Sequence, residues 1–324
     1  MKWKTTLDAL KLCVTKNDEL YKQLSQEDLI VFDGFEVFVT HRHTNDKNEV
    51  TSLSANIDMG GERFATIYFE ANDKYGTFTL FNKTFYDVLT TTPEGERVAI
   101  WTCFFHVLET LNLPFHNVTA VDVAIDMNTS MTSNFERMKK DIDNYFMYVN
   151  GKKVEGTKRI KGILVQHPTT RISLIRKPTY YIKQKEGEQL TIYDKAAELT
   201  EESPEKDEYI RGWNGIKGKT MHRLEVHLKR GRVTAICERL HITHLEFLMK
   251  LQSERFRLYI LDSLTKSFCF FKSIENANQK KGGRIGILDL LFVAMTHITT
   301  GGGSDAPIMH ISDEQVLSMK KNRK

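Results

Sequence analysis

Hydrophobic and polar residues alternate, or hydrophobic residues run in short stretches, through much of the first quarter of the chain. The two segments are 29–40 (LIVFDGFEVFVT) and 50–85, the second broken by Asp-Met-Gly-Gly and Asn-Asp-Lys-Tyr-Gly. Alternation with a period of two is typical of half-buried strands, and breaks rich in glycine and asparagine are typical of turns. This part of the sequence predicts antiparallel β-hairpins.

A helical spacing comes next, in GERVAIWTCFFHVLETLNL. Hydrophobic residues recur there every three or four positions, at Val98, Trp101, Phe105 and Leu108. Thr92 and Pro93 before them suit an N-cap and a first helical position. The segment therefore predicts one amphipathic helix.

Strands and helices then alternate. A strand is predicted at 117–127 (NVTAVDVAIDM), followed by a helix that the capping box of Ser133 and Glu136 opens and that runs to about Tyr148. Further strands are predicted at 162–167, 171–176, 179–183, 189–193 and 221–229. Helices are predicted from Val233 onward. The pattern predicts an α+β protein with a central, mostly antiparallel β-sheet, flanking helices and a helical C-terminal part. We divide it into residues 1–115, 116–232 and 233–324, of which the first two can also form one domain.

Composition narrows the class of protein. With 324 residues and 40% hydrophobic content, the chain can bury a full core. The longest apolar run, 286–295, contains Asp289 and is shorter than the roughly 20 residues that cross a bilayer. The amino end does not match a secretory signal, and the four cysteines form no C-x-x-C pair. We expect a cytoplasmic protein with no membrane partner, no zinc site and no disulfide framework.

Charge is distributed unevenly. The net charge is +4, but residues 151–232 hold 19 Lys and Arg against 11 Asp and Glu, which is +8 and leaves −4 for the rest. A basic block of this kind attracts a polyanion, although a solvated surface is the more common explanation of a charge run.

Two predicted strands each place acidic residues on one face. In AVDVAIDM, Asp122 and Asp126 share the face opposite the valines and isoleucine. Carboxylates beside a core suit Mg²⁺ or Mn²⁺, whereas on a half-exposed edge strand they would only be solvated. In HRLEVHLK, the residues sharing the polar face are Arg223, Glu225, His227 and Lys229. Glu225 could complete a metal site, although any half-buried antiparallel strand also alternates in this way.

Tyr193 ends the strand in QLTIYDKAAEL, and Lys195 and Glu198 lie on the short helix predicted after it. Tyrosine has a pKa of roughly 10, so it needs a nearby cation or base to act as a nucleophile. Lys195 would supply that cation. A tyrosine that only packs is the more common occupant of such a position.

In this order, the acidic strand, TYYIKQKEGEQLTIYDKAAEL and HRLEVHLK resemble the Rep_trans-type family of plasmid rolling-circle replication initiators and related relaxases of integrative elements. The resemblance covers about residues 117–232. Tyr193, Asp194, Lys195 and Glu198 match the family's Y-[DN]-K-x-x-E segment, whose tyrosine attacks a DNA phosphodiester; filamentous-phage initiators carry a similar segment. The acids that match the family's metal-holding motifs are Asp122, Asp126 and Glu225.

The sequence departs from that family at two places. Tyr181-Ile182-Lys183-Gln184-Lys185 stands where the family often has Tyr-x-Gly-Ser-Arg, and Ala120 stands where it often has Arg. The expected DNA contacts are Lys183, Lys185, Arg223 and Lys229. Glu198 and His227 are further candidates for metal or phosphate contacts. His41 and His43 are an alternative metal pair, similar to the histidine pair of other rolling-circle enzymes, although Arg42 stands between them where those enzymes have a hydrophobic residue. An exposed strand end or a phosphate contact is the other explanation of this pair.

The resemblance implies an HUH-endonuclease-like Rep fold, a bacterial host cell and a Mg²⁺ or Mn²⁺ cofactor. It also implies nicking and transfer of DNA strands through a 5′-phosphotyrosine, which would initiate rolling-circle replication or the transfer of a plasmid, phage or integrative element. The expected partner is DNA, at least partly single-stranded, with a helicase and a second copy of the chain as further candidates. Two alternatives stay open: a metal-dependent nuclease that uses water, and a DNA-binding replication protein without catalysis.

Overall fold

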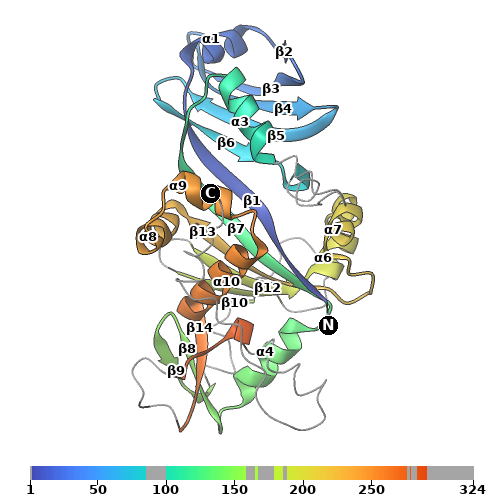
Figure 1. The fold of residues 1–324 in the computed structure, drawn as a ribbon, viewed down its shortest axis with the longest axis vertical. Helices are drawn as coiled ribbons and strands as arrows, with labels where there is room; N and C mark the ends of the chain where they lie inside the picture. The colour runs from blue at the N-terminus through green and yellow to red at the C-terminus, as the bar shows by residue number, and fades with distance from the viewer. Residues whose placement is uncertain are drawn as a thin grey trace, which may run out of the picture. The chain divides into compact units, whose positions relative to one another are not determined.

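The protein is an α+β molecule with a large antiparallel sheet, as the sequence predicts (Figure 1). The computed structural model describes residues 2–84, 100–157, 165–166, 179–184, 188–275, 278 and 283–289. The chain divides into two compact units. Unit one comprises Met1–Thr6, Val123–Leu228 and Leu251–Lys324, and unit two comprises Leu7–Asp122 and Lys229–Lys250. The three-part division expected from the sequence stays a prediction.

Unit two holds the hairpins expected from the alternating segments. Its strand order is β1-β6-β5-β4-β3-β2, with antiparallel pairing throughout. The bounds are β1 Trp3–Thr15, β2 Leu29–Phe32, β3 Phe35–Thr44, β4 Val50–Met59, β5 Glu62–Glu70 and β6 Tyr75–Leu80. Gly60 and Gly61 join β4 to β5 with φ values of 59° and 83°, which explains the glycines in the predicted turn. Strand β1, which starts in unit one, was not predicted.

The helices of unit two cover parts of its core. They are α1 Asp18–Gln26, α3 Ile100–Thr110, α8 Arg230–Leu240 and α9 His244–Lys250. Helix α3 confirms the predicted amphipathic helix, but Phe104 is its buried aromatic residue and Phe105 is only half-buried. Thr92, Pro93 and Val98 lie outside the described residues.

Unit one contains the strands that carry the motif residues. Antiparallel pairs join β10 Val165–Gln166, β11 Tyr180–Lys183, β12 Gln189–Asp194 and β13 His222–Lys229 in that order. Strand β7, Phe115–Met127, follows β13 in the strand order; its residues up to Asp122 belong to unit two and those from Val123 to unit one. The predicted strands at 117–127, 179–183, 189–193 and 221–229 are confirmed, whereas 171–176 lies outside the described residues. The helices are α4 Met131–Lys140, α6 Lys195–Glu201, α7 Asp207–Asn214 and α10 Glu254–Phe268, with a 3₁₀ turn η1 at Pro204–Lys206.

A second, four-stranded sheet in unit one corrects two predictions. Its order is β15-β14-β8-β9, with bounds Ile285–Gly286, Cys269–Ser273, Tyr145–Val149 and Lys152–Val154. The helix expected to reach Tyr148 is therefore wrong beyond Lys140, and Ser130 rather than Ser133 is its N-cap. The C-terminal part is likewise not wholly helical, because α10 leads directly into β14. Asn150 and Gly151 have φ values of 48° and 75°, so they form the tight turn between β8 and β9.

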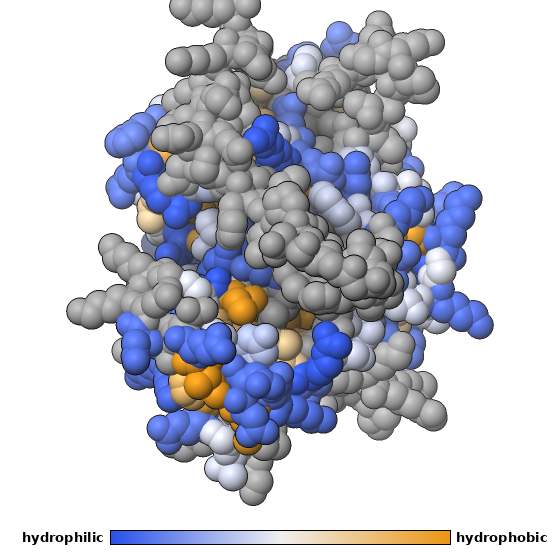
Figure 2. All heavy atoms as spheres, turned by 60° about the horizontal axis from the view of Figure 1, so that its bottom comes forward, coloured by the Kyte–Doolittle hydropathy of each residue, from blue (hydrophilic) through white to orange (hydrophobic). Residues whose placement is uncertain are grey.

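The described surface is predominantly polar. In Figure 2, hydrophilic side chains cover most of the visible coloured face, and hydrophobic side chains form small separate patches among them. Among the described residues, no helix is both long enough and apolar enough to span a membrane.

Candidate functional site

One face of the β11-β12-β13 ladder gathers most of the residues expected from the sequence. Residues that pair across antiparallel strands share a face of the sheet. Tyr193 pairs with Arg223, Thr191 with Glu225, and Gln189 with His227. On the next strand, Tyr181 pairs with Thr191 and Lys183 pairs with Gln189. Side chains of the opposite parity, including Leu190, Ile192, Leu224 and Val226, lie on the other face of these strands and are buried.

The most buried contact of this face joins Asp126 of β7 to Arg223 of β13. Both side chains have no exposed area. The guanidinium of Arg223 donates to both carboxylate oxygens of Asp126, from Nε at 2.7 Å and from Nη2 at 2.9 Å. Asn214 Nδ2 lies 3.4 Å from one of those oxygens, and Arg223 Nη1 lies 3.9 Å from Glu225 Oε2. Arg223 thus holds the two acids of neighbouring strands in place.

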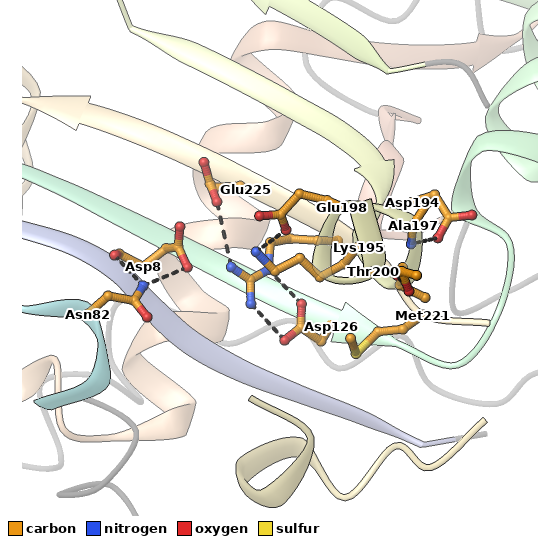
Figure 3. Close-up of polar contacts among 12 residues, drawn as sticks. Asp8, Asn82, Asp126, Asp194, Lys195, Ala197, Glu198, Thr200, Met221 and Glu225 are labelled. Carbon is orange, nitrogen blue, oxygen red and sulfur yellow. Dashed lines mark hydrogen bonds and ion pairs between the residues drawn. The ribbon is translucent and has the colours of Figure 1, made fainter. Parts of the chain in front are cut away.

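The start of α6 positions Lys195 beside Tyr193. Asp194 is the N-cap, and its Oδ1 accepts the Ala197 N–H at 3.0 Å. The Lys195 amine is buried, forms an ion pair with Glu198, and lies 5.7 Å from the centre of the Tyr193 ring. Figure 3 shows the carboxylates of Asp126, Glu198 and Glu225 directed toward the same cluster as the Lys195 side chain. The half-buried Tyr193 ring therefore lies next to a cation at the edge of a buried network of ion pairs.

The predicted metal ligands do not form a metal site in this arrangement. Asp122 and Asp126 are four residues apart on β7, and a strand rises about 3.3 Å per residue, so their Cα atoms are about 13 Å apart. Two aspartates that project from the same face cannot both reach one ion over that distance. Asp126 also has both oxygens engaged by Arg223. Across the described part of the chain, no group of three or more His, Cys, Asp or Glu side chains is arranged to hold a metal.

The other expected positions are exposed or lie outside the described residues. Lys183 is exposed on β11, and Lys185 is outside the described residues. Lys229 is exposed and belongs to unit two. His41 and His43 are exposed on β3 of unit two, with ring centres 4.2 Å apart. These histidines form a pair on β3.

Two tyrosines of β11 provide a comparison for Tyr193. The Tyr180 hydroxyl donates to Glu136 Oε1 at 2.6 Å, and burial together with that carboxylate raises the pKa of Tyr180 far above its usual value. Burial also raises the pKa of Tyr181, with smaller contributions from the carboxylates of Glu202 and Glu225. The Lys139 amine also lies 5.5 Å from the centre of the Tyr180 ring, so what distinguishes Tyr180 is its hydroxyl, which is engaged by Glu136. The sequence did not single out Tyr181, although its parity on the strand placed it on this face.

Comparison with solved structures finds a distant likeness to a replication initiator. A rolling circle replication initiator protein from Geobacillus stearothermophilus matches over 90% of this chain and 96% of that chain, with 13% sequence identity and a TM-score of 0.44. No family model matches the chain, and no curated protein matches it. A likeness at that TM-score does not establish a shared fold or a shared activity.

Proposed function

We propose that this chain cuts one strand of DNA and transfers it through a covalent bond to Tyr193. The observation that carries the proposal is the position of Tyr193 at the end of β12, where it pairs with Arg223. The centre of its ring lies 5.7 Å from the Lys195 amine. A cation near a phenol favours its phenolate, which is the nucleophilic form. The basic block from 151 to 232 would add phosphate contacts whose strength falls with salt.

The reaction is a transesterification at phosphorus. The phenolate oxygen of Tyr193 forms a bond to the phosphorus, and the bond from phosphorus to the 3′-oxygen breaks. The phenolic proton leaves to solvent, and the departing 3′-oxygen takes up a proton. The products are a 5′-phosphotyrosine on the protein and a free 3′-hydroxyl, so the energy of the phosphodiester is kept for rejoining.

Arg223 has a positioning role in this proposal. It is fully buried between Asp126 and Glu225, so it fixes β13, the strand that pairs with the strand of Tyr193, against β7. Lys195 is the cation that faces the ring, and Glu198 holds it there. Dependence on Mg²⁺ or Mn²⁺ stays a prediction from the resemblance, and we assign no step to a metal because the predicted ligands do not fit one.

In this proposal the fold is Rep-like, of the HUH-endonuclease type, and the cut starts rolling-circle replication or the transfer of a mobile element. A polymerase would extend the 3′-hydroxyl in the cytoplasm of a bacterial host. A helicase that opens the duplex and a second copy of the chain are the further partners we expect.

The test compares two tyrosines on one face of the sheet. Wild type, Tyr193→Phe and Tyr181→Phe are incubated with supercoiled DNA that carries the encoding gene and its flanks, with Mn²⁺ or with EDTA. Nicked circles and protein retained on DNA after detergent are measured. We expect the adduct to disappear in Tyr193→Phe and to persist in Tyr181→Phe. Nicking by Tyr193→Phe without an adduct would point instead to a nuclease that uses water, and binding without any nicking would point to a non-catalytic replication protein.

A further inference from the structure

The small sheet of unit one has one hydrophobic face and one face of aromatic and basic residues. The hydrophobic face is buried and holds Met147, Val149, Val154, Cys269 and Phe271. Phe135 of α4 packs there, with its ring centre 6.2 Å from that of Phe271. This face therefore belongs to the core of unit one, whereas the opposite face carries exposed and half-buried side chains as well as buried ones.

A row of side chains crosses the opposite face at right angles to the strands. Phe270 of β14 pairs with Tyr148 of β8, and Tyr148 pairs with Lys153 of β9. The rings of Phe270 and Tyr148 are stacked, with centres 4.7 Å apart and planes 7° from parallel. At the other end of the row, the guanidinium of Arg284, just before β15, lies 4.7 Å from the centre of the Phe270 ring. The order across the strands is thus cation, ring, ring, cation.

A second row lies beside the first. Lys272 of β14 pairs with Phe146 of β8, and the Lys153 amine lies 3.5 Å from the centre of the Phe146 ring. The Lys272 amine lies 5.9 Å from the centre of the Tyr148 ring. Burial differs along these rows: Arg284 and Lys153 are exposed, Phe146 and Tyr148 are half-buried, and Phe270 and Lys272 are buried. Phe270 and Lys272 therefore fix the orientation of the Phe146 and Tyr148 rings, which remain partly open to solvent.

From this arrangement we infer that the aromatic–basic face binds single-stranded DNA. The face is defined by Phe146, Tyr148, Lys153, Phe270, Lys272 and Arg284. Bases stack on Tyr148 and Phe146, and the phosphates lie near the exposed cations Lys153 and Arg284. Stacking on aromatic rings accepts any base, because every base has a π-face, and it requires a strand whose bases are not already paired. The inference rests on the proposed function and adds a place where the strand to be cut is held in the same unit as Tyr193.

The charge of this face favours a polyanion over a protein surface. Its paired positions carry two lysines, Arg284 lies at one edge, and none of the six residues is acidic. The nearest acids along the chain are Asp143, Glu155 and Glu275, which lie beyond the ends of β8, β9 and β14. A second copy of this face would bring like charges together, which costs free energy. A phosphate backbone neutralises them and releases counterions.

The test measures binding of the full chain to a fluorescent oligonucleotide without a cleavage site, by anisotropy at several salt concentrations. All variants carry Tyr193→Phe, so that cleavage does not contribute. We expect Tyr148→Ala to weaken binding by about tenfold, the usual effect of losing one stacked base. Lys153→Glu should weaken binding and reduce the salt dependence by about one phosphate contact. Lys152→Glu is the matched control, because Lys152 is exposed on the same strand but pairs with Val149 on the other face.

A second measurement detects stacking directly. In Tyr148→Trp, the oligonucleotide should quench tryptophan fluorescence more than it does in the parent protein, whose tryptophans lie elsewhere in the chain. The inference would be overturned if Lys153→Glu and Lys152→Glu weakened oligonucleotide binding equally and Tyr148→Trp showed no added quenching. Only long-range electrostatic attraction would then remain. Neither measurement requires DNA cleavage, so the two proposals can fail separately. If the Tyr193 adduct assay were negative, the proposed function would fail while DNA binding at this face would stand.

Discussion

Removing Asp126 should destabilise the protein more than a change at any solvated acid. In Asp126→Ala, the Arg223 guanidinium stays fully buried and loses both charge-assisted hydrogen bonds, at 2.7 and 2.9 Å. Removing one partner of a buried ion pair typically costs about 3–5 kcal/mol, because the remaining charge is uncompensated. Glu225, at 3.9 Å from Arg223, recovers only part of that loss. Such a cost is a large share of the roughly 5–15 kcal/mol that stabilises a typical protein.

Urea unfolding followed by tryptophan fluorescence measures this cost. Asp122→Ala is the matched control, because Asp122 lies on the same strand but is only half-buried, and we expect a loss below about 1 kcal/mol. The double variant Asp126→Leu with Arg223→Met replaces both charges by hydrophobic side chains and should recover most of the stability lost in Asp126→Ala.

The opposite result has a definite meaning. If Asp126 served only as a metal ligand among repelling acids, its removal would leave the apo protein equally stable or more stable, while it abolished cleavage. A change in unfolding free energy below about 1 kcal/mol for Asp126→Ala would therefore refute the buried-pair interpretation and restore the metal interpretation.

Three further changes test single contacts. Asp194→Ala removes the N-cap of α6 and should cost about 1 kcal/mol in the same urea assay. Gly76→Ala would press a Cβ into the Phe69 ring, so we expect a loss of about 1–3 kcal/mol. Burial lowers the pKa of His244, whose Nδ1 accepts the Val118 N–H at 3.3 Å. The neutral imidazole therefore favours the fold above the unfolded pKa of 6.5, and this stability is lost as the pH falls toward the folded pKa. His244→Asn should weaken that pH dependence of unfolding.

Each of these changes has its own control. Asp194→Ser keeps a capping oxygen and should retain most of the stability, so an equal loss in both variants would contradict the capping role. Gly231→Ala meets no atom within 4 Å, so it should not show the loss expected at Gly76. For His244, equal slopes of unfolding free energy between about pH 5 and 7 in wild type and variant would exclude it as the titrating group.

Alternation predicted many strands of the large sheet, although not β1, because these strands have one apolar face each. The strands around Tyr193 and Glu225 follow that rule, and their positions were predicted within a residue or two. The small sheet was missed because its strands are short aromatic runs next to helical sequence: YFMYV follows α4, and CFFKS continues α10. The Asn-Gly pair at 150 and 151 was the available signal for the first of them.

For the candidate site, the sequence predicted which side chains share a face within one strand, but not which strands lie side by side. Strand parity placed Glu225 and His227 on one face of their strand, and Tyr193 with Thr191 on the polar face of theirs, without any structure. It could not show that Arg223 engages Asp126, because that contact depends on which strands are neighbours. The distance between Asp122 and Asp126 was a signal that the sequence did contain, since the strand rise alone separates them by about 13 Å.

The Tyr193-Asp194-Lys195-x-x-Glu198 segment illustrates why a motif does not by itself demonstrate catalysis. Asp194 caps α6, and Lys195 and Glu198 form a buried ion pair within its first turns, so three of the four positions have structural reasons for their residue type. Tyr193 is the exception that can be tested cleanly. Phenylalanine keeps the ring, the strand preference and the contact with Lys195, so Tyr193→Phe removes only the hydroxyl. A variant that folds normally but forms no DNA adduct would therefore assign the chemistry to that oxygen.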